Sequence, residues 1–376
     1  LVFSFARLEN GLMGPFTGYL IDRFGPRWMA FFGSLLVGIG YIILATTDTY
    51  YQFLFVYIAV ISFGASTTFM QASMAVLNTW FIRRRGLVMA INAAGMRGGA
   101  AIFIPALGWL LDTYSWQKVS VGIGLMMIFW VAPFALTYRR SPESYEMLPD
   151  GDTREMREQA ERSALRGGSG RSDQSWSVRE ALHTSAYWLL ALATTLRLGV
   201  TSAIQVHAIA IFVWKSESAV AGAAMLGAIS AIAFPIILIM GWLSDRMARG
   251  PLLFVSYTTS AIGLVLLNFV DGTILVFLAF AMFAPAQASA SVNWSLVGDL
   301  FGRRNFATLR GLLAPMYNIA TVVTVAGAGL MYDRTESYTV VLLVGAALLF
   351  AAALSFFALK PPQRPDHKVP VTEEAT

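Results

Sequence analysis

Long apolar stretches separated by short polar turns run along almost the whole chain. We predict that each forms a membrane-spanning helix, because a run of about 20 apolar residues crosses a ~30 Å hydrocarbon core and suits a helix better than an alternating barrel strand. The eleven predicted spans are residues 1–21, 28–47, 51–78, 86–111, 119–138, 186–213, 219–243, 251–270, 273–297, 310–331 and 337–359.

Polar landmarks recur at a nearly constant offset, which indicates an internal duplication. The phrase GYLIDRFGPR begins at Gly18, and the similar GWLSDRMAR begins 223 residues later at Gly241. Five predicted spans precede the polar stretch 139–185 and six follow it, so we expect that the first half lacks one N-terminal helix. The predicted units are an N-terminal bundle (1–138), a central loop (139–185), a C-terminal bundle (186–359) and a disordered tail (360–376).

Composition and charge placement agree with a protein that crosses a membrane many times. Hydrophobic residues make up 56% of the chain and charged residues only 13%. Alternate loops and the tail hold 21 lysines and arginines, whereas the loops on the other side hold only Lys118, Lys215 and Arg334. By the positive-inside rule the first set is cytoplasmic, and so is the C-terminus. We expect the cell inner (plasma) membrane as the location.

Several classes of function are not indicated by the sequence. No basic stripe with interleaved aromatic residues suggests nucleic-acid binding. The chain has no cysteine, which excludes disulfides and thiolate metal sites. No Gly-rich stretch ends in Gly-Lys-Ser/Thr, so nucleotide hydrolysis is not expected. We predict neither enzymatic catalysis nor a metal or cofactor.

The central loop is the only sizeable polar segment. Asp152 and Glu155 could open a short polar helix that ends before Gly167, and Ser177 with Glu180 forms a capping-box pattern before the next span. The loop is interpreted as a tether between the halves, with a regulatory role as the alternative.

The repeated loop carries a family resemblance. Gly18, Asp22, Arg23, Gly25 and Arg27 are similar to the signature loop of the major facilitator superfamily, and the stretch from Gly241 to Arg246 is similar to its degenerate second copy. The segments WFIRRRGLVMAINAAG and DLFGRRNFATLRG further resemble bacterial members of the oxalate/formate antiporter and monocarboxylate transporter group. The resemblance implies an all-α membrane protein of two pseudo-symmetric six-helix bundles, of which eleven of the twelve helices, spans II to XII, are present.

The resemblance also implies a pair of gates. Asp22 is expected at the start of span XI near Arg310 and Gly311, and Asp245 at the start of span V near Gly86. A carboxylate beside the positive N-terminus of a helix is stabilising, so each aspartate could act as a latch. A simple anchoring turn is the alternative. The predicted gating residues are Gly18, Asp22, Arg23, Arg27, Arg84, Gly241, Asp245 and Arg246.

Polar residues at mid-depth of the spans are the candidates for substrate binding, because charged groups are costly there and usually functional. Arg97 and Arg197 each lie 11 residues from the cytoplasmic start of a span, about 16 Å deep at 1.5 Å per residue. Their alternative role is helix packing. The predicted substrate-binding residues are Arg97, Arg197, Gln71, Gln287 and Asn318, and the candidates for proton coupling are Glu9 and His207, the latter with a structural role as the alternative.

The charge balance inside the spans points to the substrate class. Three arginines and one glutamate leave an excess of two positive charges, which an apolar interior tolerates poorly without an anion. We therefore predict a monomeric secondary transporter that moves a small organic anion, a mono- or dicarboxylate, by alternating access, with a proton or counter-anion as coupling ion. The alternatives are an exporter of an apolar or cationic compound on the same fold, and a non-transporting membrane sensor.

Overall fold

The computed structural model describes residues 2–153, 155, 175–215, 218–360 and 362. The N-terminal half consists of α1 (Val2–Phe24), α2 (Pro26–Leu44), a composite span of α3 (Tyr50–Phe55), η1 (Val56–Ser62), α4 (Phe63–Ala65), η2 (Ser66–Ala72) and α5 (Ser73–Trp80), then α6 (Arg85–Thr113), and a last span of α7 (Trp116–Met126), η3 (Met127–Val131) and α8 (Ala132–Ala135). Two short 3₁₀ turns, η4 (Pro142–Tyr145) and η5 (Pro149–Gly151), follow in the central loop.

The C-terminal half begins with α10 (Val178–Leu182), which has the predicted capping box between Ser177 and Glu180. It continues with α11 (Ser185–Trp214), α12 (Ala219–Arg246), α13 (Arg249–Leu266), a broken span of α14 (Thr273–Ala281), α15 (Ala284–Ala288) and α16 (Ala290–Phe301), then α17 (Phe306–Leu312) with α18 (Ala314–Thr335), and α19 (Thr339–Ala358).

All eleven predicted spans are confirmed as helical, with ends that differ by a few residues. Within the described residues, nine of them are long and apolar enough to cross a membrane. The other two are α1, which carries several charged residues, and α13, which has 18 residues and begins with Arg249. The predicted helix after Asp152 and the predicted disordered tail fall mainly outside the described residues.

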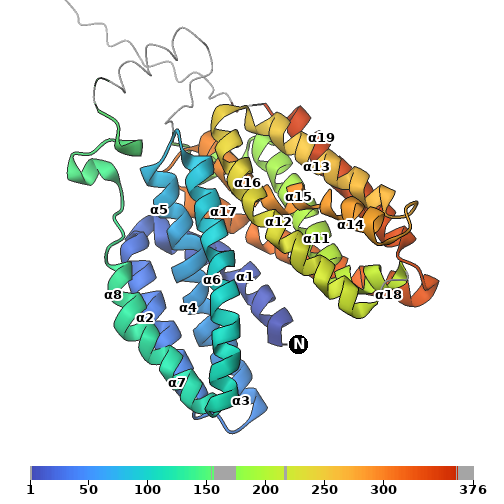
Figure 1. The fold of residues 1–376 in the computed structure, drawn as a ribbon. Helices are drawn as coiled ribbons and strands as arrows, with labels where there is room; N and C mark the ends of the chain where they lie inside the picture. Colours follow the sequence, from blue (N-terminus) through green and yellow to red (C-terminus); the bar gives the residue numbers. More distant parts are fainter. Residues whose placement is uncertain (1, 154, 156–174, 216–217, 361, 363–376) are drawn as a thin grey trace, which may run out of the picture.

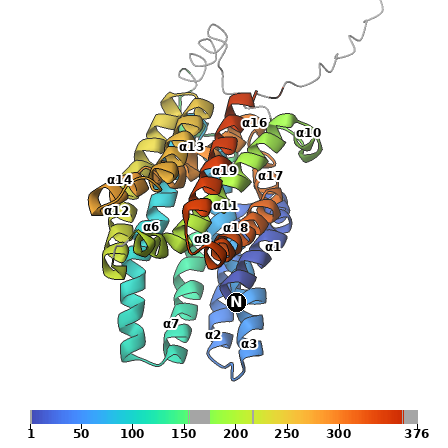
Figure 2. The ribbon, with the colours of Figure 1, turned by 90° about the vertical axis from the view of Figure 1, so that its right-hand side faces the viewer.

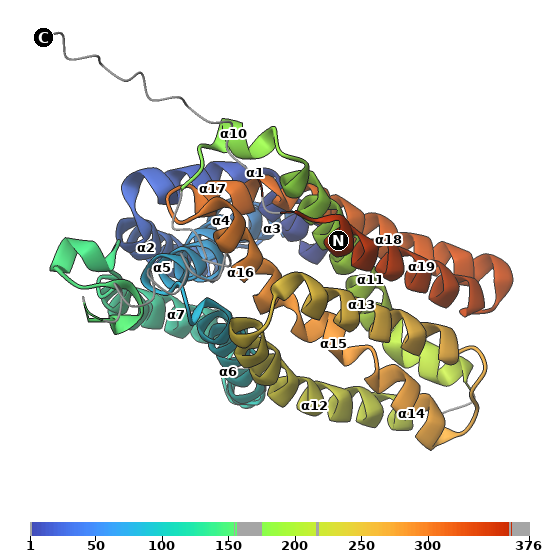
Figure 3. The same cartoon turned by 90° about the horizontal axis from the view of Figure 1, so that it is seen from above.

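The two halves are helix bundles that lie side by side. They converge at the end that carries η4 and η5 and diverge toward the other end (Figure 1). We call the first of these the closed end, and α10 lies there too (Figure 2). Across the boundary, α1 packs against α17 and α18, while α6 packs against α12 and α16 (Figure 3). Inside the halves, α2 packs against α7 and α8, and α13 against α19.

Glycines allow the close approach of the halves. A Cβ atom at Gly18 of α1 would lie 2.3 Å from the carbonyl oxygen of Ala307, and one at Gly241 of α12 would lie 2.3 Å from the Cβ of Ala90. These two glycines occupy the same place in the duplicated phrase. The backbone contact between the halves therefore has the symmetry of the sequence repeat.

In the N-terminal half, one face of α6 is less covered by neighbouring helices than the corresponding face in the C-terminal half. In the C-terminal half, α11 packs against α18 and α19. On α6, which corresponds to α17 and α18, a Cβ added at any of Gly95, Gly98, Gly99 or Gly108 would meet nothing within 4 Å.

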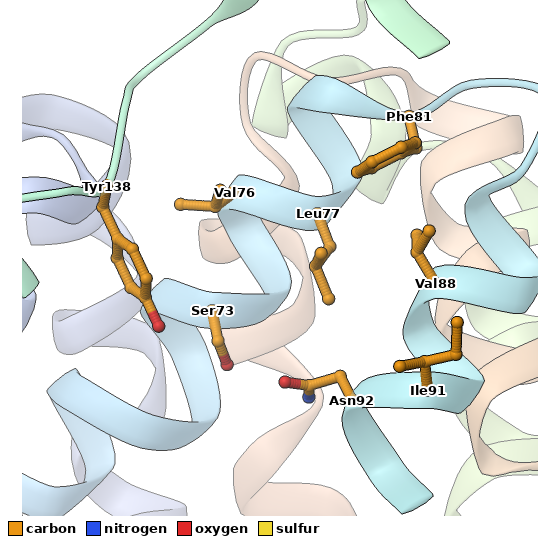
Figure 4. A pocket seen from close by; sticks show the side chains of 8 residues that line it. All are labelled: Ser73, Val76, Leu77, Phe81, Val88, Ile91, Asn92 and Tyr138. Carbon is orange, nitrogen blue, oxygen red and sulfur yellow. The ribbon is translucent and has the colours of Figure 1, made fainter. Parts of the chain in front are cut away.

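A pocket of about 340 Å³ opens on this side between α5, α6 and Tyr138, with Ser73 and Asn92 among its lining residues (Figure 4). It includes Val88, whose counterpart Leu309 accepts a hydrogen bond from Tyr187 of α11 in the other half. The predicted missing helix stays a prediction, and this bare face is where it would pack.

The orientation of the closed end is a prediction that single cysteines can test, because the chain has none of its own. Ala248, between α12 and α13, and Thr335, at the end of α18, are both exposed and belong to opposite ends of the molecule. We expect Thr335→Cys to react with an impermeant thiol reagent in intact cells, and Ala248→Cys to react only after permeabilisation. Labelling of Ala248→Cys in intact cells would place the closed end outside.

Candidate functional site

Asp22, at the end of α1, caps a helix of the opposite half. Its Oδ2 accepts hydrogen bonds from the backbone N–H of Thr308 at 2.7 Å and from the Thr308 hydroxyl at 2.6 Å, and its Oδ1 accepts from the N–H of Ala307 at 3.3 Å. These N–H groups lie in the first turn of α17, where a helix has no internal acceptors for them. The contact is at the start of span XI, as predicted, but it precedes Arg310 and Gly311.

Asp245 makes the same contact in the opposite direction. Its Oδ1 accepts from the N–H of Gly86 and its Oδ2 from the N–H of Leu87, both at 2.8 Å, in the first turn of α6. Arg249 also donates to Asp245 at 3.1 Å. The two aspartates therefore form crossed caps, in which each half supplies one carboxylate and one helix N-terminus.

An ion-pair network adds to the second cap. Asp299 of α16 lies 2.7 Å from Nη1 of Arg85 and 3.0 Å from Nη1 of Arg249. The side chains of Arg85 and Arg249 are 3% and 2% exposed, so these charges are largely removed from solvent. The network joins the first residue of α6 to both α16 and α13. The sequence interpretation chose Arg84, whereas the arginine that reaches across is its neighbour Arg85.

The other predicted gating arginines lie around the caps and contact their own helices. Arg23 donates to the hydroxyl of Tyr19 at 2.7 Å, and Arg246 stacks 3.8 Å from the ring centroid of Trp242. Arg27 lies over the ring of Trp28, 5.5 Å from its centroid. The side chain of Arg84 is exposed.

The described part of the central loop is fixed to both halves. Asp150 accepts hydrogen bonds from the N–H groups of Ile82, Arg83 and Arg84, just before α6. Trp176, from the other end of the loop, donates its N–H to the carbonyl of Phe301 at 3.0 Å.

A bond across the halves also involves this loop. Arg303 donates to Glu143 at 2.8 Å and to the carbonyl of Thr79 at 3.0 Å. Partial burial acts to raise the pKa of Glu143, but a backbone hydrogen bond and the bond and charge of Arg303 outweigh it and hold the pKa below its ordinary value. Glu143 therefore stays ionised at neutral pH, which keeps this contact charged.

Arg197 is the most deeply buried of the predicted substrate-binding residues. It lies on α11 with 2% of its surface exposed. Its Nη1 donates to the carbonyl of Ala286 at 3.4 Å, while Nε and Nη2 are buried without a hydrogen-bond partner among the described residues. Gln287, the residue after Ala286, is half-buried.

The remaining predicted substrate residues do not gather around Arg197. Arg97 is exposed on α6. Gln71 donates to the carbonyl of Gly14 at 3.3 Å and accepts from Arg310 at 3.2 Å, so it links three spans near the closed end. Asn318 donates to the carbonyl of Ala314 on its own helix.

The two candidates for proton coupling differ in their surroundings. Both carboxylate oxygens of Glu9 are buried without a hydrogen-bond partner among the described residues. His207 uses both ring nitrogens. Nε2 lies 3.2 Å from the carbonyl of Val325, which can only accept, so Nε2 carries a proton; in the neutral ring Nδ1 then accepts from the hydroxyl of Tyr338 at 3.1 Å.

Three polar residues at these sites were missed by the sequence interpretation. Asp299 and Arg85 lie at helix ends, where charged residues are common, and only their pairing in space reveals a role. Arg310 was counted with the cytoplasmic loops, whereas it is 4% exposed between Gln71 and the ring of Trp294, 4.6 Å from the ring centroid.

Comparisons with known proteins give the fold and the family. The chain is 28% identical over 141 residues to the Fujikurins efflux protein of Gibberella fujikuroi, a match that covers 37% of this chain and only 30% of that protein. It is 23% identical over 369 residues to a probable sulfoacetate transporter, SauU, of Cupriavidus necator, covering 96% of this chain and 84% of that one.

A solved transporter, FucP in the outward conformation, superposes with a TM-score of 0.72 at 14% identity, covering 96% of this chain and 89% of that one. That likeness shows a shared fold. The sequence profile of the Major Facilitator Superfamily matches residues 1–294 and 216–375, which together span nearly the whole chain. The chain therefore belongs to the Major Facilitator Superfamily of transporters.

Proposed function

We propose that this transporter is a secondary carrier that moves a small organic anion, a mono- or dicarboxylate, across the cell inner membrane by alternating access. The closed end is assigned to the cytoplasm from the distribution of lysine and arginine. In this assignment the crossed caps of Asp22 and Asp245 close the cytoplasmic side while the other side is open. The anion binds at mid-depth and its charge is balanced there by arginine.

The observation that carries this proposal is the state of Arg197. The residue is 2% exposed, and two of its three side-chain nitrogens make no full hydrogen bond within the described residues. No carboxylate of the described residues forms an ion pair with it. An unpaired charge in such a place costs several kcal/mol, and an anionic ligand removes that cost. A guanidinium also presents parallel N–H donors that match a carboxylate.

The full-length match to a probable sulfoacetate transporter supports the same class, since sulfoacetate is a small organic anion. The partial matches include an efflux protein and a riboflavin transporter, so resemblance by itself does not choose the substrate. The proposal therefore rests on Arg197. Arg97, exposed on α6, is the second candidate cation for the anion's path.

The caps are proposed as latches that break when the carrier turns inward. In Asp22→Asn the charge is lost, and the amide can no longer accept three hydrogen bonds from α17. A loss of ~1 to 2 kcal/mol would change the ratio of the two conformations roughly 5- to 30-fold toward the inward form.

A reporter for this change is Ser295→Cys. Ser295 is 0% exposed and lies 3.3 Å from the sulfur of Met89 in the other half. Its thiol should react faster in the Asp22→Asn background than in the unchanged background. Asp48→Asn, at an exposed position in the loop after α2, is the matched control and should leave the rate as it was. Equal reactivity in all three proteins would make Asp22 a simple anchor.

Substitution of Arg197 tests the substrate class. Arg197→Ala should abolish the thermal stabilisation of purified protein by carboxylates, and Arg197→Lys should restore only part of it, because an ammonium keeps the charge but loses the paired donors. Arg97→Ala should also weaken binding. Arg334→Ala, which removes an exposed cation at the end of α18, is the control and should bind as well as the unchanged protein.

The same assay should include a neutral sugar and a cationic drug. Stabilisation by either of these, or carboxylate binding that survives in well-folded Arg197→Ala, would overturn the organic-anion proposal and leave the transporter fold untouched.

A further inference from the structure

The span that faces Arg197 is broken, and a serine from another helix fills the break. Between α14 and α16 the backbone leaves the regular helical pattern. The hydroxyl of Ser260, on α13, donates to the carbonyl of Met282 at 3.1 Å and accepts from the N–H of Ala286 at 3.1 Å. Ser260 therefore supplies hydrogen bonds that the interrupted helix lacks, and this stabilises the break without help from a charged group.

Arg197 is not needed to satisfy the backbone at this break. The carbonyl of Ala286 already accepts a hydrogen bond from the hydroxyl of Ser289 at 2.8 Å. The bond from Arg197 to the same oxygen is 3.4 Å long, beyond the usual range for N–H···O bonds. A charged side chain that is 2% exposed and makes only this long bond and a weak contact with Tyr257 is poorly explained as a brace for the span.

A second buried polar group that makes no full hydrogen bond lies beside Arg197. Tyr257, on α13, is 0% exposed, and its hydroxyl contacts the side chains of Arg197 and Ser289 without reaching the geometry of a full hydrogen bond to either. Buried tyrosine hydroxyls usually make a full hydrogen bond, so a weakly bonded one next to a guanidinium with two unsatisfied nitrogens indicates a shared acceptor that both groups can reach.

We propose that Tyr257 binds the transported anion together with Arg197, at a site inside the C-terminal half between α11, α13 and the break at α15. This inference rests on the proposed function and names a further group that recognises the anion. One carboxylate oxygen accepts from Nε and the other from Nη2 of Arg197, and the hydroxyl of Tyr257 donates to one of them. Arg197 can release its long bond to the carbonyl of Ala286, because Ser289 already donates a hydrogen bond to that oxygen.

This arrangement favours a carboxylate over a spherical anion. Nε and Nη2 of one guanidinium present two roughly parallel N–H donors, which fit two oxygens on one carbon. A halide is a single acceptor atom that all three donors would have to share, whereas a carboxylate offers one oxygen to each N–H. The site therefore selects planar anions by geometry as well as by charge.

Removal of the hydroxyl alone is the test. Tyr257→Phe keeps the ring and its packing, and it should weaken the binding of acetate and lactate to the purified protein about 10- to 100-fold, the usual loss for a hydrogen bond to a charged group. The melting temperature without ligand should change little, because the hydroxyl makes only weak contacts with Arg197 and Ser289. The affinity is read from the ligand-induced shift in melting temperature over a concentration series.

Tyr187→Phe is the matched control. Tyr187 lies on α11 and is also buried, but its hydroxyl donates to the carbonyl of Leu309 at 3.1 Å. This variant should melt at a lower temperature without ligand and bind acetate as well as the unchanged protein. The two tyrosines thus separate a role in binding from a role in stability.

The outcomes distinguish this inference from the proposed function. One outcome is that acetate and lactate bind the unchanged protein, that Arg197→Ala loses this binding, and that Tyr257→Phe binds them within twofold of the unchanged protein. In that case the role of Tyr257 is refuted and the organic-anion function stands. If no carboxylate binds the unchanged protein, the proposed function fails first. If chloride stabilises the protein as well as acetate does, and Tyr257→Phe weakens both equally, the site is a halide site and the inference is overturned.

Discussion

The structure depends on a backbone contact that is made twice. At the closed end, Asp22 and Asp245 each accept the free N–H groups at the start of a helix in the opposite half. Those N–H groups carry partial positive charge and have no acceptor in their own helix, so a carboxylate stabilises them more strongly than water does. Glycine at positions 18 and 241 lets the helices come close enough for the bonds to form.

The two contacts are alike in their caps and different in their support. Around Asp245, the buried arginines Arg85 and Arg249 both lie beside Asp299. The residue that corresponds to Asp299 in the other half is Asn78, an uncharged side chain that donates a 3.5 Å hydrogen bond to the carbonyl of Gly302. The duplication therefore kept the caps and did not keep the charge network. Because burial strengthens the interaction between paired charges, the α6–α12 side of the boundary is held by more than hydrogen bonds to backbone.

The sequence predicted the fold well, because the signals that specify a membrane bundle are local. Apolar length marks each span, and the repeat offset marks the two halves. The crossed caps were expected from the family resemblance, which is carried by the recurrence of Gly18 with Asp22 and Gly241 with Asp245. The capping box of Ser177 and Glu180, at the N-terminus of α10, is another local pattern that the structure confirms.

Contacts between distant segments were less predictable. Arg85 and Asp299 are separated by 214 residues, and nothing in their neighbours distinguishes them from other charges at helix ends. Depth along a helix placed Arg197 and Gln71 at one level, but it could not show which way either side chain turns. Arg197 turns toward the break at α15, whereas Gln71 turns toward α1 and Arg310. The tyrosine beside Arg197 carries no sequence signal, because it is one of 13 in the chain.

The measurement that tests the central claim most directly is the distance between the halves at the closed end. Thr137, in the N-terminal half, and Ala248, in the C-terminal half, are both exposed there and are suitable positions for spin labels. Double electron–electron resonance should give mainly a short distance in the unchanged protein, and a longer one should gain population when Asp22 and Asp245 are both replaced by asparagine. A distance distribution that stays the same after both replacements would contradict the account, because the caps would then not hold the closed end together.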